Sequence, residues 1–178
     1  MPTATPRSGS PASMPRSWMA RASQRLGAFA VTAVLGLSAV GAFAEQCAPP
    51  PSPQQQVVSQ TNQRRAERGL PALSVNSRLT TAAQQHSADQ ANRNHMTHTG
   101  SDGSNAGQRI TAQGYRWSAW AENVAAGQRD ATAVMDAWMN SSGHRANILS
   151  TKVTQIGVGL AYSSDNTPYW TMVLAKPG

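Results

Sequence analysis

Only one cysteine, Cys47, occurs among the 178 residues. A single thiol cannot form an internal disulfide, so a stable fold must rest on a packed apolar core, which a chain of this length can supply. Cys47 lies in the segment C-A-P-P-P-S-P, where proline keeps the chain extended, so we expect the thiol to be exposed. The shortage of cysteine therefore excludes a small scaffold held by disulfides.

Acidic residues are also scarce, with 8 Asp and Glu against 15 Lys and Arg. Four of the 15 basic residues lie within residues 1–44, which leaves 11 against 8, or about +3, in the rest of the chain. The basic residues there cluster only at Arg64, Arg65 and Arg68, with no interleaved aromatic residues for base stacking. This composition argues against nucleic acid as a partner.

The sequence lacks the G-x-S-x-G motif and any internal repeat. Ser142 is separated from His144 by Gly143 alone, a spacing that disfavours in-line attack by a serine activated by that histidine. A serine hydrolase and a repeat array are therefore both disfavoured.

Residues 1–44 have the pattern of an export signal. Four arginines without an acidic residue precede an apolar run from Leu26 to Ala44, which ends in the small-x-small pattern Ala42-Phe43-Ala44. We predict cleavage before Glu45, a secreted or periplasmic location, and no stable membrane span after cleavage. The alternative is an uncleaved anchor, because the run approaches the ~20 residues that cross a bilayer.

The remaining chain predicts one α+β domain over residues 54–178, preceded by a Pro-rich tether at residues 45–53. Helical periodicity and end signals predict helices over about 54–68, 77–93 and 105–113, and a further one that begins after Asp130 and breaks at Gly143. Apolar runs predict strands over 117–126, 156–162 and 169–174. We expect the helices to pack on a small, mainly antiparallel sheet.

Three polar segments each carry one ionisable side chain beside small or turn-forming residues. They are M-T-H-T-G with His98, A-E-N-V-A with Glu122, and W-M-N-S-S-G-H-R-A-N-I-L with His144. If the fold brings them together, two imidazoles could bind a divalent metal, and the carboxylate could orient one imidazole or act as a base. We therefore predict a shared cleft.

Several ordered motifs resemble bacterial members of the CAP superfamily, also called SCP-like, which includes cysteine-rich secretory proteins, antigen 5 and pathogenesis-related proteins. The motifs are N-Q-R-R, L-T-T-A-A-Q-Q-H-S-A-D, H-T-G-S-D-G, A-E-N-V-A-A-G, the tryptophan-led segment above, and I-G-V-G. The resemblance covers about residues 54–176. It implies a secreted three-layer α-β-α sandwich with a cleft at the edge of the sheet.

The resemblance also implies a cleft with two histidines and two glutamates, in which some members bind zinc or another divalent metal through the histidines. The matching positions here are His98, His144 and Glu122. The second acid would fall three residues after Trp138, where this chain has Ser141. A four-group site is thus incomplete, and Glu122 can serve as a metal ligand or as a base but not as both.

Two functions follow as hypotheses. The first is a non-enzymatic secreted module whose cleft binds a small-molecule, lipid-like, peptide or cell-wall ligand, with a divalent metal at His98 and His144. The alternative is a metal-dependent hydrolase of peptide or peptidoglycan bonds, in which a zinc-bound water attacks and Glu122 is the catalytic base.

Other polar and aromatic residues have simpler expected roles. We expect His86 to be a packed, hydrogen-bonded helix residue, because it shares an apolar stripe with Leu79, Ala82 and Ala83. Asn62 and Arg65 are expected to satisfy buried backbone carbonyls. Of the tryptophans, we expect Trp138 and Trp170 in the core, and Trp117 and Trp120 partly exposed near the cleft.

Overall fold

The structure of the protein is a computed structural model that describes residues 49–178. The predicted export signal and Cys47 lie outside the described residues. The helices are α1 (Pro53–Ala66), α2 (Ser77–Arg93), α3 (Ala106–Ala112), α4 (Ala131–Asn140) and α5 (Ser142–Ile148). The strands are β1 (Ser74–Val75), β2 (Trp117–Ala126), β3 (Gln155–Tyr162) and β4 (Pro168–Pro177). No helix within residues 49–178 is both long enough and apolar enough to cross a bilayer.

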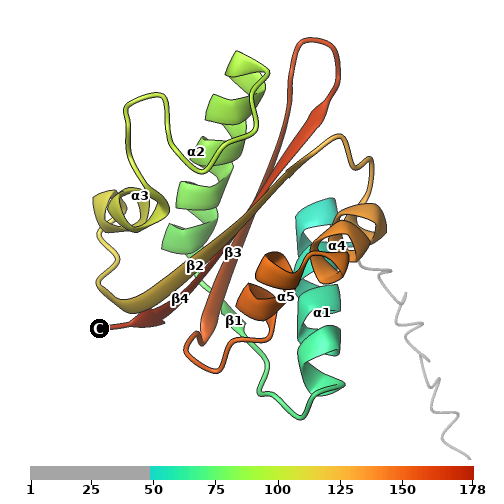
Figure 1. Cartoon of the computed structure of the whole chain (residues 1–178), viewed down its shortest axis with the longest axis vertical. Coiled ribbons are helices and arrows are strands. Elements are labelled where there is room, and N and C mark those ends of the chain that lie inside the picture. The colour runs from blue at the N-terminus through green and yellow to red at the C-terminus, as the bar shows by residue number, and fades with distance from the viewer. Residues whose placement is uncertain (1–48) are drawn as a thin grey trace, which may run out of the picture. The chain divides into compact units, whose positions relative to one another are not determined.

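The four strands form one sheet in the order β1-β3-β4-β2. The central strand β4 runs antiparallel to β2 and β3, and only the two-residue β1 pairs in parallel. Helices α2 and α3 cover one face, and α1, α4 and α5 cover the other (Figure 1). The expected three-layer α-β-α sandwich with a mainly antiparallel sheet is confirmed.

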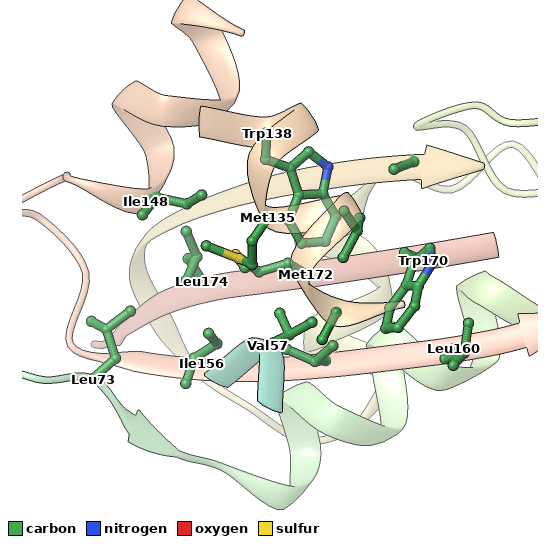
Figure 2. Close-up of a cluster of buried hydrophobic side chains, with 14 of the residues drawn as sticks. Val57, Leu73, Met135, Trp138, Ile148, Ile156, Leu160, Trp170, Met172 and Leu174 are labelled. Atoms are coloured by element: carbon green, nitrogen blue, oxygen red, sulfur yellow. The ribbon is translucent and has the colours of Figure 1, made fainter. Parts of the chain in front are cut away.

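The larger core lies between the sheet and the layer of α1, α4 and α5 (Figure 2). Val57 of α1, Trp138 of α4 and Trp170 of β4 are fully or almost fully buried there, and each such side chain contributes about 1.5–3 kcal/mol through burial. The indole N–H of Trp138 donates to the carbonyl of Val124, 3.1 Å away. Trp138 and Trp170 therefore belong to the core, as predicted.

On the other face of the sheet, the close packing of α2 depends on two glycines of β3. A β-carbon at Gly157 would overlap the backbone of Leu79 and Thr80, and one at Gly159 would overlap the backbone of Ala83. Helix α2 thus lies directly on β3, which only residues without a side chain permit at this distance. The neighbouring positions of β3 point the other way, where Ile156 and Val158 join the larger core.

Helix α1 is tied to the chain that follows it by two polar side chains. The Asn62 amide exchanges two hydrogen bonds with the backbone of Leu73, at 3.0 and 2.8 Å. The buried Arg65 guanidinium donates to three backbone carbonyls, those of Pro71, Ile148 and Ser150. These contacts confirm the structural roles predicted for both residues, and they remove Arg65 from any solvated basic face.

Two predicted boundaries are wrong. Pro53 is the first residue of α1 rather than the last of the tether, because Ser52 caps the helix in a capping box with Gln55 and proline suits the first helical turn. The helix that follows Asp130 ends at Ser141, whose backbone is extended, and not at Gly143, which lies inside α5. The ends of α2 agree with the prediction, since Asn76 caps its first turn.

Candidate functional site

Glu122 and His98 are in direct contact. Glu122 lies in the middle of β2, opposite Val173 of β4, and its side chain is 2% exposed. The Nδ1–H of His98 donates to Oε1 of Glu122 across 2.9 Å. This hydrogen bond is the largest influence on the imidazole and raises the pKa of His98 above its ordinary value. Two of the three predicted groups therefore meet, although His98 is mostly exposed.

A third group at this position, Arg109 of α3, was missed by the sequence analysis. Its Nη2 lies 2.7 Å from Oε2 of Glu122, and its Nη1 donates to the carbonyl of Ser104 at 2.7 Å. The pair is almost fully buried. Both oxygens of Glu122 are thus engaged by cationic or N–H donor groups. In the sequence, Arg109 is a lone basic residue on a short predicted helix between the His98 and Glu122 motifs. Such a residue is by itself only a weak indication of a site.

His144 lies in the first turns of α5, on the side of the sheet opposite α3. Burial lowers the pKa of its imidazole, and the charge of His98 lowers that pKa further. The neutral form of His144, which metals need, is therefore favoured.

Two asparagines connect α5 to β2. Asn123 Nδ2 donates to the carbonyl of His144 at 3.1 Å. Asn147 Nδ2 donates to Asn123 Oδ1 at 2.8 Å and to the carbonyl of Glu122 at 3.2 Å. This small network sets the position of α5, and hence of His144, relative to the strand that carries Glu122.

Ser141 caps no backbone amide of α5 with its side chain. It is absent from the lining of the pocket of about 310 Å³ over Glu122, which consists of His98, Asn105, Ala106, Trp120, Ala121, Glu122 and Asn147. His144 does not line this pocket either. The cleft membership predicted for Ser141 and His144 stays a prediction.

The donor groups match only part of a metal site. Within residues 49–178, no three His, Cys, Asp or Glu side chains form a group that could hold a metal ion. Because both oxygens of Glu122 are engaged, the imidazoles of His98 and His144 are the predicted metal ligands that remain among the described residues. The Nδ1–H···carboxylate contact of His98 resembles the hydrogen bond that orients metal-binding histidines, and Nε2 makes no hydrogen bond to residues 49–178. Two imidazoles are fewer protein ligands than the four of a closed structural zinc site.

Three further expectations are confirmed. His86 is buried, and its Nε2 donates to the carbonyl of Thr97 at 2.8 Å. Burial lowers the pKa of His86, which keeps it neutral. Trp117 and Trp120 are 40% and 38% exposed, and Trp120 forms part of the wall of the pocket over Glu122.

Comparisons with known proteins agree with this fold. A sequence model of the cysteine-rich secretory protein family, CAP, matches residues 58–174. The uncharacterized protein YkwD of Bacillus subtilis is 34% identical over 118 residues, which are 66% of this chain and 45% of YkwD, so the chain spans under half of that relative.

Solved structures are similar as well. An extracellular protein of Bacillus anthracis that contains an SCP domain gives a TM-score of 0.64 at 27% identity, over 72% of this chain and 45% of the other. An outer surface protein of Borrelia burgdorferi gives 0.66 at 22% identity, over 71% and 93%, a likeness of fold alone. With a family match over most of the described residues and the expected sandwich, the chain belongs to the cysteine-rich secretory protein (CAP) family.

Proposed function

We propose that the protein is an exported, non-enzymatic binding module whose cleft around His98, Glu122 and His144 takes a component of the cell envelope. The observation that carries this proposal is the double engagement of Glu122, by His98 at one oxygen and by Arg109 at the other. A general base must reach the proton that it abstracts with one of its oxygens, and both oxygens of Glu122 already accept from protein donors. Glu122 then orients His98 and anchors α3 rather than acting as a base.

A divalent metal is part of the proposal in a limited role. His98 and His144 would hold it, and it would supply a positive charge for a carbonyl, carboxylate or phosphate group of the ligand. With two imidazoles and no third protein ligand from residues 49–178, we expect the ion to exchange readily. Isothermal titration of the purified protein with zinc should give weak binding, and a His98→Ala/His144→Ala variant should lose it.

The binding role is tested directly by cosedimentation with isolated peptidoglycan and with phosphatidylglycerol vesicles. We expect the wild-type protein to pellet with the peptidoglycan and the double histidine variant to pellet less. Equal recovery of the two proteins in every pellet would overturn the assignment of the cleft. Pelleting with the vesicles alone would replace the cell-wall ligand with a lipid.

The alternative is the metal-dependent hydrolase, favoured by the resemblance of the His98–Glu122 contact to the hydrogen bond that orients a metal-binding histidine. It predicts release of soluble fragments from peptidoglycan or casein in the presence of zinc, abolished by a chelator. It also predicts that Glu122→Gln lowers turnover by orders of magnitude. Intact substrates after long incubation with zinc would exclude the hydrolase and leave the binding module.

A further inference from the structure

Beside the pocket over Glu122 lies a second hollow that contains two exposed indoles. Its volume is about 380 Å³, and its lining consists of Asn105, Gly107, Gln108, Thr111, Trp117 and Trp120. This volume lies within the range of small-molecule sites. Asn105 and Trp120 also line the pocket over Glu122, so the two hollows adjoin. None of the six lining residues carries a charge, which favours a neutral polar ligand.

An irregularity of β2 brings the two indoles to the same side. Residues three apart in a regular strand point to opposite faces of the sheet. The register of β2 against β4 shifts between Trp117 and Ala119, however, and such a shift redirects a side chain. The rings of Trp117 and Trp120 consequently meet edge to face, with centroids 6.2 Å apart. Because β2 is an edge strand, the pair lies at the border of the sheet.

Gly107 of α3 supports both rings. A β-carbon there would lie 2.7 Å from Nε1 of Trp120 and 3.1 Å from Cζ2 of Trp117, so only glycine leaves room for the indoles. The Nε1–H of Trp117 donates to Oγ1 of Thr111 at 3.1 Å. Figure 1 shows α3 followed by a short connection into β2, which places these parts side by side. The indole pair is therefore a fixed surface rather than two loose side chains.

The capping box of α3 adds two hydrogen-bond donors. Asn105 Oδ1 accepts from the amide N–H of Gln108, and Gln108 Oε1 accepts from that of Asn105, both at 2.9 Å. The carbonyl oxygens of both side chains are thereby used within the helix. Their NH₂ groups donate to no protein group within residues 49–178, and both residues line the hollow, so the amides can donate to hydroxyl or acetamido oxygens of a ligand.

We propose that this indole–amide hollow is a subsite for one sugar residue of a neutral glycan chain. The C–H face of a pyranose ring would stack on an indole while its hydroxyl or acetamido oxygens accept from the two amides. The inference rests on the proposed function, because it names the glycan as the envelope component, and it places the next residue of the chain over the Glu122 pocket.

The test is titration of the purified protein with the hexamer of N-acetylglucosamine and with cellohexaose, followed by calorimetry and tryptophan fluorescence. We expect saturable binding of at least one hexamer with a change in fluorescence. Trp120→Ala should weaken it roughly tenfold, the loss of one stacking partner. Tyr162→Ala removes an exposed aromatic residue from the far end of β3 and should leave the affinity unchanged.

Gln108→Glu is a second variant that keeps the fold. Glutamate at this position preserves the acceptor of the capping box and replaces only the NH₂ donor, so we expect weaker glycan binding at unchanged thermal stability.

Absence of saturable binding to both hexamers overturns the inference, as does binding that Trp120→Ala and Gln108→Glu leave unchanged. If peptidoglycan is still pelleted in those cases, the proposed function stands without this subsite. Glycan binding by a His98→Ala/His144→Ala variant that has lost zinc would support the subsite and separate it from the metal.

Discussion

Arg109 on α3 and Glu122 on β2 form a nearly buried ion pair, with 2.7 Å between Nη2 and Oε2. The pair joins a helix of one face of the sandwich to the edge strand of the sheet. It also fixes the carboxylate that orients His98. Arg109 is therefore a positioning residue for the cleft, even though it matches none of the motifs that first indicated the site.

Replacement of Arg109 should be costly. Arg109→Met leaves the Glu122 carboxylate buried without its strong partner, and breaking a buried pair from one side costs about 3–5 kcal/mol. Urea unfolding should therefore show a large loss of stability. Arg116→Gln removes the same charge from an exposed position and should change stability by no more than about 0.5 kcal/mol. Equal losses in the two variants would show that the pair contributes little.

The histidines should titrate in a defined order. His98 should have a pKa above about 6.5, the value of an unperturbed histidine, and His86 and His144 should have pKa values below it. NMR titration of the ring protons measures all three. In Glu122→Gln, which removes the charge but keeps an acceptor, we expect the pKa of His98 to fall. An unchanged His98 titration would mean that the contact does not persist in solution.

The same shifts give opposite dependences of stability on pH. Because the folded pKa of His98 is raised, its pairing with Glu122 stabilises the fold below pH 6.5 and is lost as the pH rises through the folded pKa. The exposure of His98 makes this contribution small. The folded pKa of His86 is lowered, so its contribution is present above pH 6.5 and is lost as the pH falls. His86→Gln should flatten the acid side of the stability profile measured by urea unfolding.

The sequence predicted elements and motif residues better than their mutual placement. Local patterns were sufficient for α2 with its Asn76 cap, and the motifs were sufficient to predict that His98 and Glu122 lie together. Arg109 was missed because an arginine on a seven-residue helix has the same local pattern whether it faces solvent or a buried acid. Only the packing of α3 on β2 decides between the two.

Departures from regular backbone geometry could not be predicted from the sequence pattern either. A period of two places Trp117 and Trp120 on opposite faces, and only the register shift against β4 brings them together. The pattern I-G-V-G predicted a strand, but it did not show that its glycines lie against α2, because that contact involves residues almost eighty positions earlier. The break between α4 and α5 falls at Ser141, whose backbone is extended, although Gly143 is the residue whose type more strongly predicts a helix end.

Gly157, which is packed against α2, and Gly143, which has open space around it, allow a matched comparison. Gly157→Ala forces a β-carbon into the backbone of α2, and we expect a loss of at least about 1–3 kcal/mol, the usual cost of overpacking. Gly143 lies in α5, and a β-carbon added there would meet no atom within 4 Å, so Gly143→Ala should stabilise the fold by about 0.5–1 kcal/mol. Thermal unfolding of both variants measures the difference. A neutral Gly157→Ala would show that α2 can move away from β3 without cost.

Asn123 offers a test of how His144 is positioned. Its fully buried amide links the carbonyl of His144 to Asn147, so Asn123→Ala leaves buried polar groups unpaired at a cost of about 1–3 kcal/mol. We also expect the ring resonances of His144 to shift while those of His86 stay in place, because α5 loses its link to β2. Asn140→Ala, at an exposed position of α4, is the control and should affect neither. If His144 keeps its resonances in the destabilised Asn123→Ala protein, packing of Ile148 and the Arg65 hydrogen bonds at the end of α5 hold the helix without the asparagine network.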